Sequence, residues 1–209
     1  MLKSFQKLNL EFINKYFMSI NQINHQFQNE EFYLPNWEVK YLFVGTFNPS
    51  GGENVKYYYG REKNLFWKIL SQIFKVDFNP NSTDFFDLII KHKIACVDMI
   101  NSVNKINSNY FTENELQFLL GKGYSDSKII NNKLIRNYNT SEINKIINKN
   151  NCNVYSTWGK GSNLKEWKVE LNKLSFNENL VSPSPVARVP KGFQKVQYIL
   201  NDWSNKIII

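Results

Sequence analysis

Residues 41–50 read Tyr-Leu-Phe-Val-Gly-Thr-Phe-Asn-Pro-Ser, an apolar run that ends abruptly at Gly45. The stretch Val39–Val44 is short and rich in β-branched and aromatic residues, which predicts a buried strand. Asn48-Pro49 and Gly51-Gly52 are strong turn signals directly after it. Gly45 lets the backbone approach a ligand closely or adopt a positive φ, so the end of this strand is a candidate site. The alternative is an ordinary loop that ends the strand.

Similar apolar runs alternate with helical patterns along the rest of the chain. The further predicted strands cover residues 94–99, 153–158 and 179–181, and the predicted helices cover 64–74, 84–91, 141–149 and 162–174, with a last helix after 193. The segment 101–139 is polar and irregular and reads as a loop, whereas residues 3–28 carry apolar side chains at helical spacing. We therefore predict an α/β protein, a three-layer α/β/α sandwich around a short, mainly parallel sheet. It would occupy residues 37–209, after a helical extension over residues 1–36.

The composition limits the classes of protein to which this chain can belong. The 209 residues are enough for one core, and a net charge of +8 favours an anionic partner such as nucleic acid, although Lys-rich proteomes contain many basic enzymes of other kinds. No apolar run approaches the length of a membrane span and no signal peptide is evident, so we expect a cytoplasmic protein without a membrane partner. Cys96 and Cys152 lie in apolar runs without Cys-x-x-Cys spacing, which indicates free thiols. With His25 and His92 as its only histidines, the chain suggests no metal site.

A second informative segment precedes the helix predicted at residue 64. It contains Tyr57-Tyr58-Tyr59-Gly60 and then Asn64-Leu65-Phe66-Trp67. A half-exposed aromatic cluster is suited to stacking on a nucleobase. The alternative is a hydrophobic flap that packs on the domain, and Asn64 has a matching alternative as a helix cap.

A third segment, Ser182–Pro190, reads Ser-Pro-Ser-Pro-Val-Ala-Arg-Val-Pro. Three prolines stiffen it, so its hydroxyls and amides could hold a phosphodiester at low entropic cost. Val186 would then be an apolar wedge and Arg188 a contact to phosphate or to an unpaired base. A Pro-rich connection to the last helix is the other interpretation. Gly159-Lys160-Gly161, after a predicted strand, is likewise a phosphate contact or a simple turn.

Asp98 is the carboxylate of most interest, because it lies at the end of the predicted strand 94–99. It would either face the pocket or cap a backbone turn.

Taken together, these segments resemble the motifs of the uracil-DNA glycosylase superfamily. The likeness is strongest to its mismatch-specific uracil/thymine and hypoxanthine-DNA glycosylase branches. The matching motifs are Gly45-Thr46-Phe47-Asn48-Pro49, then Tyr58-Tyr59-Gly60 leading to Asn64-Leu65-Phe66-Trp67, and finally Pro183-Ser184-Pro185-Val186-Ala187-Arg188. Their order agrees with the family, and the likeness spans about residues 38–205.

The resemblance implies a role for each matching residue. Asn48 would position the attacking water, Gly45, Thr46 and Phe47 would bind the base, and Tyr59 would stack on it. Asn64 matches a motif asparagine that is itself a candidate for the critical role in the hypoxanthine branch. The implied DNA contacts are Lys160, Ser182, Ser184, Val186 and Arg188.

The chain also departs from the family pattern. It has one residue more between Gly45 and Asn48 than the mismatch-specific pattern, no acidic water activator, no late-loop histidine and no Cys-x-x-Cys, so we expect no iron–sulfur cluster and no other cofactor.

The resulting expectation is a monomeric, monofunctional DNA glycosylase that removes a flipped deaminated base, uracil or hypoxanthine, in base excision repair. Two alternatives stay open. One is a catalytically inactive nucleic-acid-binding protein of the same fold. The other is an α/β enzyme that acts on free nucleotides and has no need of the segment Val186–Arg188.

Overall fold

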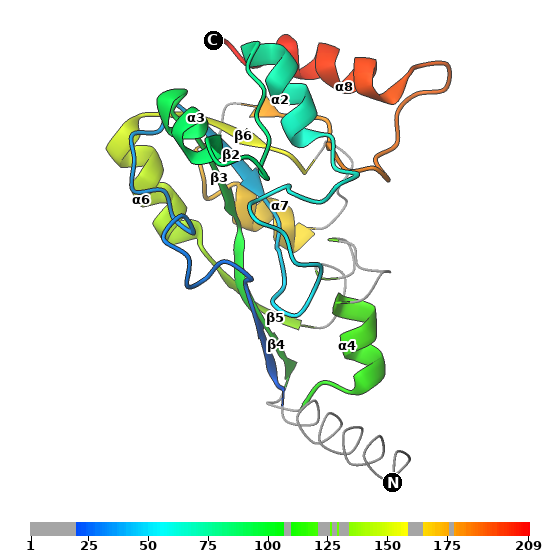
Figure 1. The fold of residues 1–209 in the computed structure, drawn as a ribbon. Helices are drawn as coiled ribbons and strands as arrows, with labels where there is room; N and C mark the ends of the chain where they lie inside the picture. The colour runs from blue at the N-terminus through cyan, green and yellow to red at the C-terminus, as the bar shows by residue number, and fades with distance from the viewer. Residues whose placement is uncertain are drawn as a thin grey trace, which may run out of the picture. The chain divides into compact units, whose positions relative to one another are not determined.

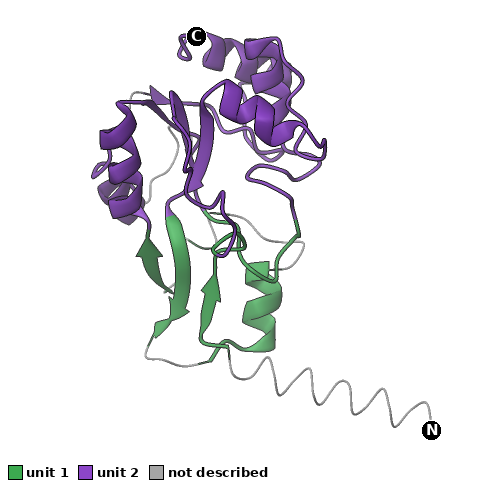
Figure 2. Cartoon of the chain, turned by 60° about the vertical axis from the view of Figure 1, so that its left-hand side comes forward, with its two compact units in different colours: residues 1–28, 47–54, 100–138 green, residues 29–46, 55–99, 139–209 purple. Residues whose placement is uncertain are grey.

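The computed structural model describes residues 20–106, 110–120, 126, 129, 134–158, 165–175 and 178–209. The chain divides into two compact units, which Figure 2 shows in green and purple. Unit 1 comprises Met1–Gln28, Phe47–Asn54 and Ile100–Tyr138, and unit 2 comprises Asn29–Thr46, Val55–Met99 and Asn139–Ile209. The predicted division into an extension and a domain at residue 36 is a different partition and stays a prediction.

Unit 2 contains a parallel sheet of four strands in the order β3-β2-β6-β7, which confirms the predicted α/β class. The strands are β2 (Tyr41–Gly45), β3 (Ile94–Asp98), β6 (Asn153–Ser156) and β7 (Glu178–Asn179). All five residues of β2 and of β3 are buried, as expected for parallel strands that are covered on both faces. Because β2 and β3 are continuous apolar runs, the strands predicted from sequence agree closely with the observed ones.

Helices lie on both sides of the parallel sheet, with α2 (Phe66–Phe74) and α8 (Lys195–Ser204) on one side and α6 (Thr140–Asn150) on the other (Figure 1). The remaining helices of this unit are α3 (Phe85–Lys91) and α7 (Lys165–Leu171). Aromatic rings join the first pair of helices to the sheet. Phe43 of β2 lies edge-on to Phe66, with centroids 5.1 Å apart, and parallel to Trp203, with centroids 6.0 Å apart.

A polar contact joins α6 to α7. The Thr140 hydroxyl of α6 donates to the Glu170 carboxylate of α7. From sequence, Thr140 or Ser141 is predicted to cap this helix. The helix instead begins at Thr140, and the residue before it, Asn139, makes no side-chain cap, so that prediction is wrong. Thr140 lies inside the first turn of α6, and its hydroxyl donates to α7 rather than to a backbone group of its own helix.

Unit 1 contains an antiparallel sheet of three strands in the order β1-β4-β5, accompanied by α4 (Glu113–Leu120). The strands are β1 (Gln22–Asn24), β4 (Ile100–Lys105) and β5 (Leu134–Tyr138). The loop predicted over 101–139 is therefore wrong, because most of its described residues are regular structure. The helix predicted over 3–28 is wrong at residues 22–24, which form β1, and its residues 3–19 lie outside the described residues.

Hydrogen bonds between polar side chains take the place of an apolar pattern across this sheet. The Asn137 amide donates to Ser102 Oγ at 2.8 Å and to Asn104 Oδ1 at 2.9 Å. The Asn104 amide in turn donates to Gln22 Oε1 at 3.0 Å. Ile23 and Val103 are fully buried, so these strands are polar in part of their sequence and apolar in the rest.

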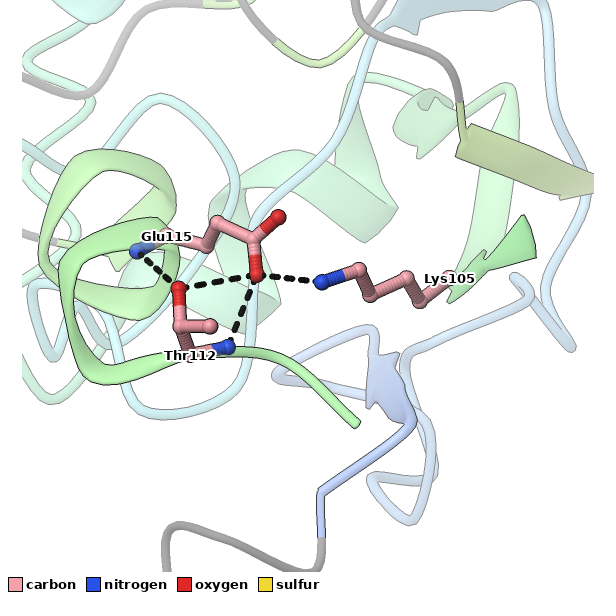
Figure 3. A network of polar contacts seen from close by, with 3 residues as sticks. All are labelled: Lys105, Thr112 and Glu115. Carbon is pink, nitrogen blue, oxygen red and sulfur yellow. Dashed lines mark hydrogen bonds and ion pairs between the residues drawn. The ribbon is translucent and has the colours of Figure 1, made fainter. Parts of the chain in front are cut away.

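A polar network fixes the start of α4 (Figure 3). The Thr112 amide donates to Glu115 Oε2 at 2.7 Å, and the Glu115 amide donates back to Thr112 Oγ1 at 3.3 Å, which is a capping box. Lys105 Nζ, at the end of β4, lies 2.6 Å from the same carboxylate oxygen. The network therefore ties the helix to the sheet of its own unit.

Acid is expected to weaken this network. The Lys105 ammonium, helped by the Thr112 amide, lowers the pKa of Glu115 below its ordinary value of 4.5. Because the folded-state pKa is depressed, the contribution to stability is fully present above about pH 4.5 and is lost as the pH falls through the folded pKa. Glu115→Gln should therefore lower the free energy of unfolding by about 1 kcal/mol or less at pH 7, and by less in acid. Urea denaturation at both pH values measures this, with Glu113→Gln in the same helical turn as the matched control. An equal loss of unfolding free energy at the two pH values would show that the charge of Glu115 does not stabilise this network.

No helix among the described residues is both long and apolar enough to cross a membrane. Within the same residues, no three His, Cys, Asp or Glu side chains gather in a way that could hold a metal ion. Both cysteines are free, as predicted, with Cys96 buried and Cys152 half-buried. Burial raises the pKa of the Cys96 thiol well above its ordinary value and that of Cys152 to about 11, so neither is a ready nucleophile at pH 7.

Candidate functional site at the end of the parallel sheet

Gly45 is the last residue of β2, and two side chains of unit 2 converge on it. A methyl group added to Gly45 would stand 2.2 Å from Asp98 Oδ1 and 2.6 Å from the Tyr59 hydroxyl oxygen. Gly45 does not have a positive φ, so its lack of a side chain serves close approach. The groups that approach it here are the protein's own carboxylate and phenol. They form the centre of the candidate site.

Parallel register explains why Asp98 lies beside Gly45. Gly45 of β2 pairs with Asp98 of β3, and the Met99 amide donates to the Gly45 carbonyl at 3.0 Å. Asp98 is 3% exposed, so the carboxylate is held in a buried setting. The Asp98 side chain lies beside Gly45 at the end of the sheet. Its role in the candidate site stays a prediction.

Two contacts fix the Tyr59 side chain. Its ring stacks on Phe66, with centroids 4.0 Å apart and planes inclined by 3°, and its hydroxyl shares a 2.8 Å hydrogen bond with Thr157 Oγ1. Its backbone has a φ of 57°, which is unfavourable for a residue with a side chain. A non-glycine residue held in this region often marks a functional position, because the surroundings must compensate for the strain.

The strained turn is closed by neighbouring contacts. The Gly60 amide donates to the Tyr57 carbonyl at 3.0 Å, and the Trp67 indole N–H donates to the Tyr58 carbonyl at 2.8 Å. A methyl group at Gly60 would lie 2.8 Å from the Tyr57 carbonyl oxygen, so the turn requires glycine there. The turn therefore presents Tyr59 in one orientation.

The three tyrosines do not form one exposed cluster. Tyr57 is 1% exposed and Tyr58 is fully buried, whereas Tyr59 is half-buried. The prediction of a half-exposed cluster is thus wrong for the first two, which belong to the core. Phe66 covers one face of the Tyr59 ring, so any base would have to stack on the opposite face.

A buried network of phenols and an amide holds the backbone carbonyl of Asp98. The Asn139 amide donates to the Tyr33 hydroxyl at 2.7 Å and to the Asp98 carbonyl at 2.9 Å, and the Tyr58 hydroxyl donates to the Tyr33 carbonyl at 2.8 Å. Burial raises the pKa of Tyr33 to about 12, with the Asp98 charge adding to the effect, and it raises that of Tyr58 well above 10. Both phenols are therefore neutral at pH 7 and act as hydrogen-bonding groups only.

Sequence reasoning missed three members of this site. Thr157 follows β6, the other neighbour of β2, so its place at a parallel strand end was the signal that could have identified it. Tyr33 and Asn139 come from an irregular segment and from the start of a helix. No motif or periodicity distinguishes them.

Asn64 lies at the start of α2, where its Oδ1 accepts a 3.0 Å hydrogen bond from the Phe66 amide. The N-cap position of α2 is Leu65, which makes no side-chain cap, so Asn64 bonds the first helical amide from one residue before the N-cap. Its catalytic role stays a prediction.

The Ser182–Pro190 loop is anchored at its base within unit 2. The Pro183 carbonyl accepts from the Leu65 amide at 3.0 Å, just before α2, and the Val181 amide donates to Asp202 of α8 at 2.8 Å. The Ser184 carbonyl accepts from the Ala187 amide at 3.0 Å, which closes a turn around Pro185 and Val186. Val186 is 79% exposed at the tip of this turn. The predicted wedge is thus an apolar side chain held in solvent.

The other predicted DNA contacts are divided between described and undescribed residues. Ser182 and Ser184 are half-buried and Arg188 is exposed. Lys160 lies outside the described residues.

Phe47 and Asn48 belong to unit 1, whereas Gly45, Thr46 and Tyr59 belong to unit 2. Phe47 is buried and lies edge-on to His25, with ring centroids 5.7 Å apart. The Asn48 carbonyl accepts from the Gln26 amide at 2.7 Å, so the half-buried Asn48 has a firmly held backbone. The water-positioning role of Asn48 stays a prediction.

A scan against models of protein families and searches of curated proteins and of solved structures find no match to this chain.

Proposed function

We propose that this protein is a monofunctional DNA glycosylase that hydrolyses the N-glycosidic bond of a flipped, deaminated base, uracil or hypoxanthine, in base excision repair. One juxtaposition carries the proposal. The half-buried ring of Tyr59 rests on Phe66, the first residue of α2, and the Ser182–Pro190 loop is bonded to Leu65, the residue before it. A stacking surface and an exposed apolar wedge are thus attached to the same helical turn. Base flipping requires both features, one to receive the base and one to fill the gap it leaves.

The proposed reaction breaks the C1′–N bond so that its electron pair leaves with the base. The sugar becomes oxocarbenium-like, a water oxygen bonds to C1′, and the proton released from that water neutralises the departing base. Tyr59 would stack on the base while backbone groups of Thr46 and Phe47 bond its polar edge. Asn48, three residues after Gly45 in the chain, would hold the water. No lysine Schiff base and no cofactor takes part.

Electrostatics at the end of the sheet supports this chemistry. Asp98 is a buried carboxylate whose charge would stabilise the positive charge that develops on the sugar. Because it is held by the fold rather than by solvent, little reorganisation is needed as the bond opens. The phenol of Tyr33 is neutral and so adds no second negative charge near it.

The proposed setting follows from the composition of the chain. A net charge of +8 favours DNA binding with a strong dependence on salt. Ser182, Ser184, Lys160 and Arg188 are the proposed contacts to the DNA strands. We propose a monomer that acts in the cytoplasm.

A base-release assay tests the proposal. Labelled oligonucleotides with uracil, hypoxanthine, xanthine or mispaired thymine, single- and double-stranded, are incubated with the protein and then cleaved with alkali at abasic sites. We expect cleavage of the strand that carries uracil or hypoxanthine. Salt-sensitive binding without cleavage would instead favour an inactive nucleic-acid-binding protein. Activity on mononucleosides without DNA binding would favour an enzyme of free nucleotides.

A further inference from the structure

An exposed aromatic side chain follows the Ser182–Pro190 loop, which we call the wedge loop. Phe193 is 60% exposed, and its neighbours in sequence include Arg188, Lys191 and Lys195. We name these four residues the Phe193 surface. Residues 179–201 contain these three cations and no acidic residue. The surface thus combines an exposed ring with charge of a single sign.

The backbone presents Phe193 in a defined way. The Phe193 amide donates to the Pro190 carbonyl at 3.3 Å, and Gly192 within this turn has a φ of 92°, which favours glycine. The Phe193 ring lies edge-on to Tyr198, with centroids 5.4 Å apart. Phe193 directly precedes the N-cap Gln194 of α8, so this contact is a hydrophobic staple. The staple explains why the two rings touch, but it does not require a ring so exposed in a segment with three cations.

A hydrogen bond joins the Phe193 surface to the wedge loop. Lys195 Nζ donates to the Pro185 carbonyl at 2.5 Å, next to Val186. The two exposed apolar side chains, Val186 and Phe193, therefore belong to one connected segment between the base of the loop and α8.

We propose that the Phe193 surface binds an unpaired nucleotide of a DNA strand, with Phe193 stacked on the base and Lys191 beside the phosphate. This inference rests on the proposed function for its choice of DNA. A surface ring can stack only on a base whose face is uncovered, and in a duplex each internal base is covered by its neighbours. Aromatic rings interleaved with cations are the usual means of binding single strands. The preferred substrate is therefore DNA with a single-stranded stretch next to the lesion.

Binding of a labelled oligothymidylate and of a lesion-free duplex, followed by fluorescence anisotropy, tests this assignment. Phe193→Leu keeps an apolar staple to Tyr198, so its unfolding temperature should equal that of wild type. Because it loses the aromatic face, it should bind the single strand roughly 5- to 100-fold more weakly. Phe193→Trp should bind it as well as wild type. Lys191→Gln should reduce the salt dependence by about 0.7 in logarithmic slope, as expected for one lost phosphate contact. Duplex affinity should stay close to the wild-type value in both Phe193 variants.

Two outcomes would overturn the inference: single-strand binding by Phe193→Leu at the wild-type level, or an equal loss for single strand and duplex. The base-release assay separates this failure from that of the proposed function. Base release by a protein whose Phe193 variants bind like wild type would reject the Phe193 surface alone. Phe193-dependent single-strand binding without release of any base would reject the glycosylase and keep the surface.

Discussion

Gly45→Ala is expected to slow base release by about 100-fold or more. The added methyl group would stand 2.2 Å from Asp98 Oδ1 and 2.6 Å from the Tyr59 hydroxyl oxygen, both far inside van der Waals contact. The buried carboxylate and the stacked ring would have to move, and a displacement of about 1 Å in a catalytic constellation costs roughly two orders of magnitude in rate. The same overpacking should lower the free energy of unfolding by about 1–3 kcal/mol. Single-turnover base release and urea denaturation measure the two effects.

A double variant separates steric displacement from a general loss of folding. Asp98→Ala removes the atom that a methyl group at Gly45 would meet first. If the clash is the cause, Gly45→Ala/Asp98→Ala should be more stable than the sum of the two single losses predicts. Base release would still be low in the double variant, because the proposed carboxylate is gone. Wild-type stability and activity in Gly45→Ala would show that the site at the end of β2 is misassigned.

The strands of unit 2 could be predicted because their sequences are apolar throughout. Parallel strands that are covered on both faces need no alternation, so β2 and β3 appear as short β-branched and aromatic runs. Gly45 and Asp98 could be placed at one edge of the sheet by the same reasoning. The convergence of Asp98 and Tyr59 on Gly45 could not, since it depends on the turn that gives Tyr59 its positive φ.

The strands of unit 1 were missed for a physical reason. β4 and β5 carry Asn, Ser and Arg where a predicted strand would carry apolar residues, and hydrogen bonds such as Asn137 to Ser102 replace the missing apolar pairs. In a chain so rich in asparagine, such a stretch looks like a loop. Cross-strand pairs are invisible until the register of the strands is known.

The tyrosine run illustrates the same limit within the site. From sequence, three adjacent rings before a helix indicated a surface cluster. In the fold, Tyr57 and Tyr58 fill the core, and only Tyr59 remains half-buried. The left-handed backbone of Tyr59 directs its ring away from the core, and periodicity in the sequence does not predict such a turn.

Asn48→Ala is expected to abolish measurable base release while DNA binding persists. The Asn48 backbone is held by the Gln26 amide, and alanine preserves that bond, so the fold of unit 1 should change little. The loss would come from the side-chain amide that is proposed to hold the water, and misplacement of a reactant costs about 100-fold or more. Asn48→Asp is the conservative control, because a carboxylate oxygen can also accept a hydrogen bond from water. It should retain part of the activity.

Asn64→Ala separates the two asparagines. This variant should have a free energy of unfolding about 1 kcal/mol lower than wild type, because Asn64 Oδ1 accepts a hydrogen bond from the Phe66 amide at the start of α2. Base release by Asn64→Ala should then stay near the wild-type rate at a temperature where the variant is folded. The reverse result, full activity in Asn48→Ala and none in a folded Asn64→Ala, would move the water to Asn64. In that case the attacking water would lie beside the α2 turn that also supports Tyr59 and the wedge loop, and the whole reaction would belong to unit 2.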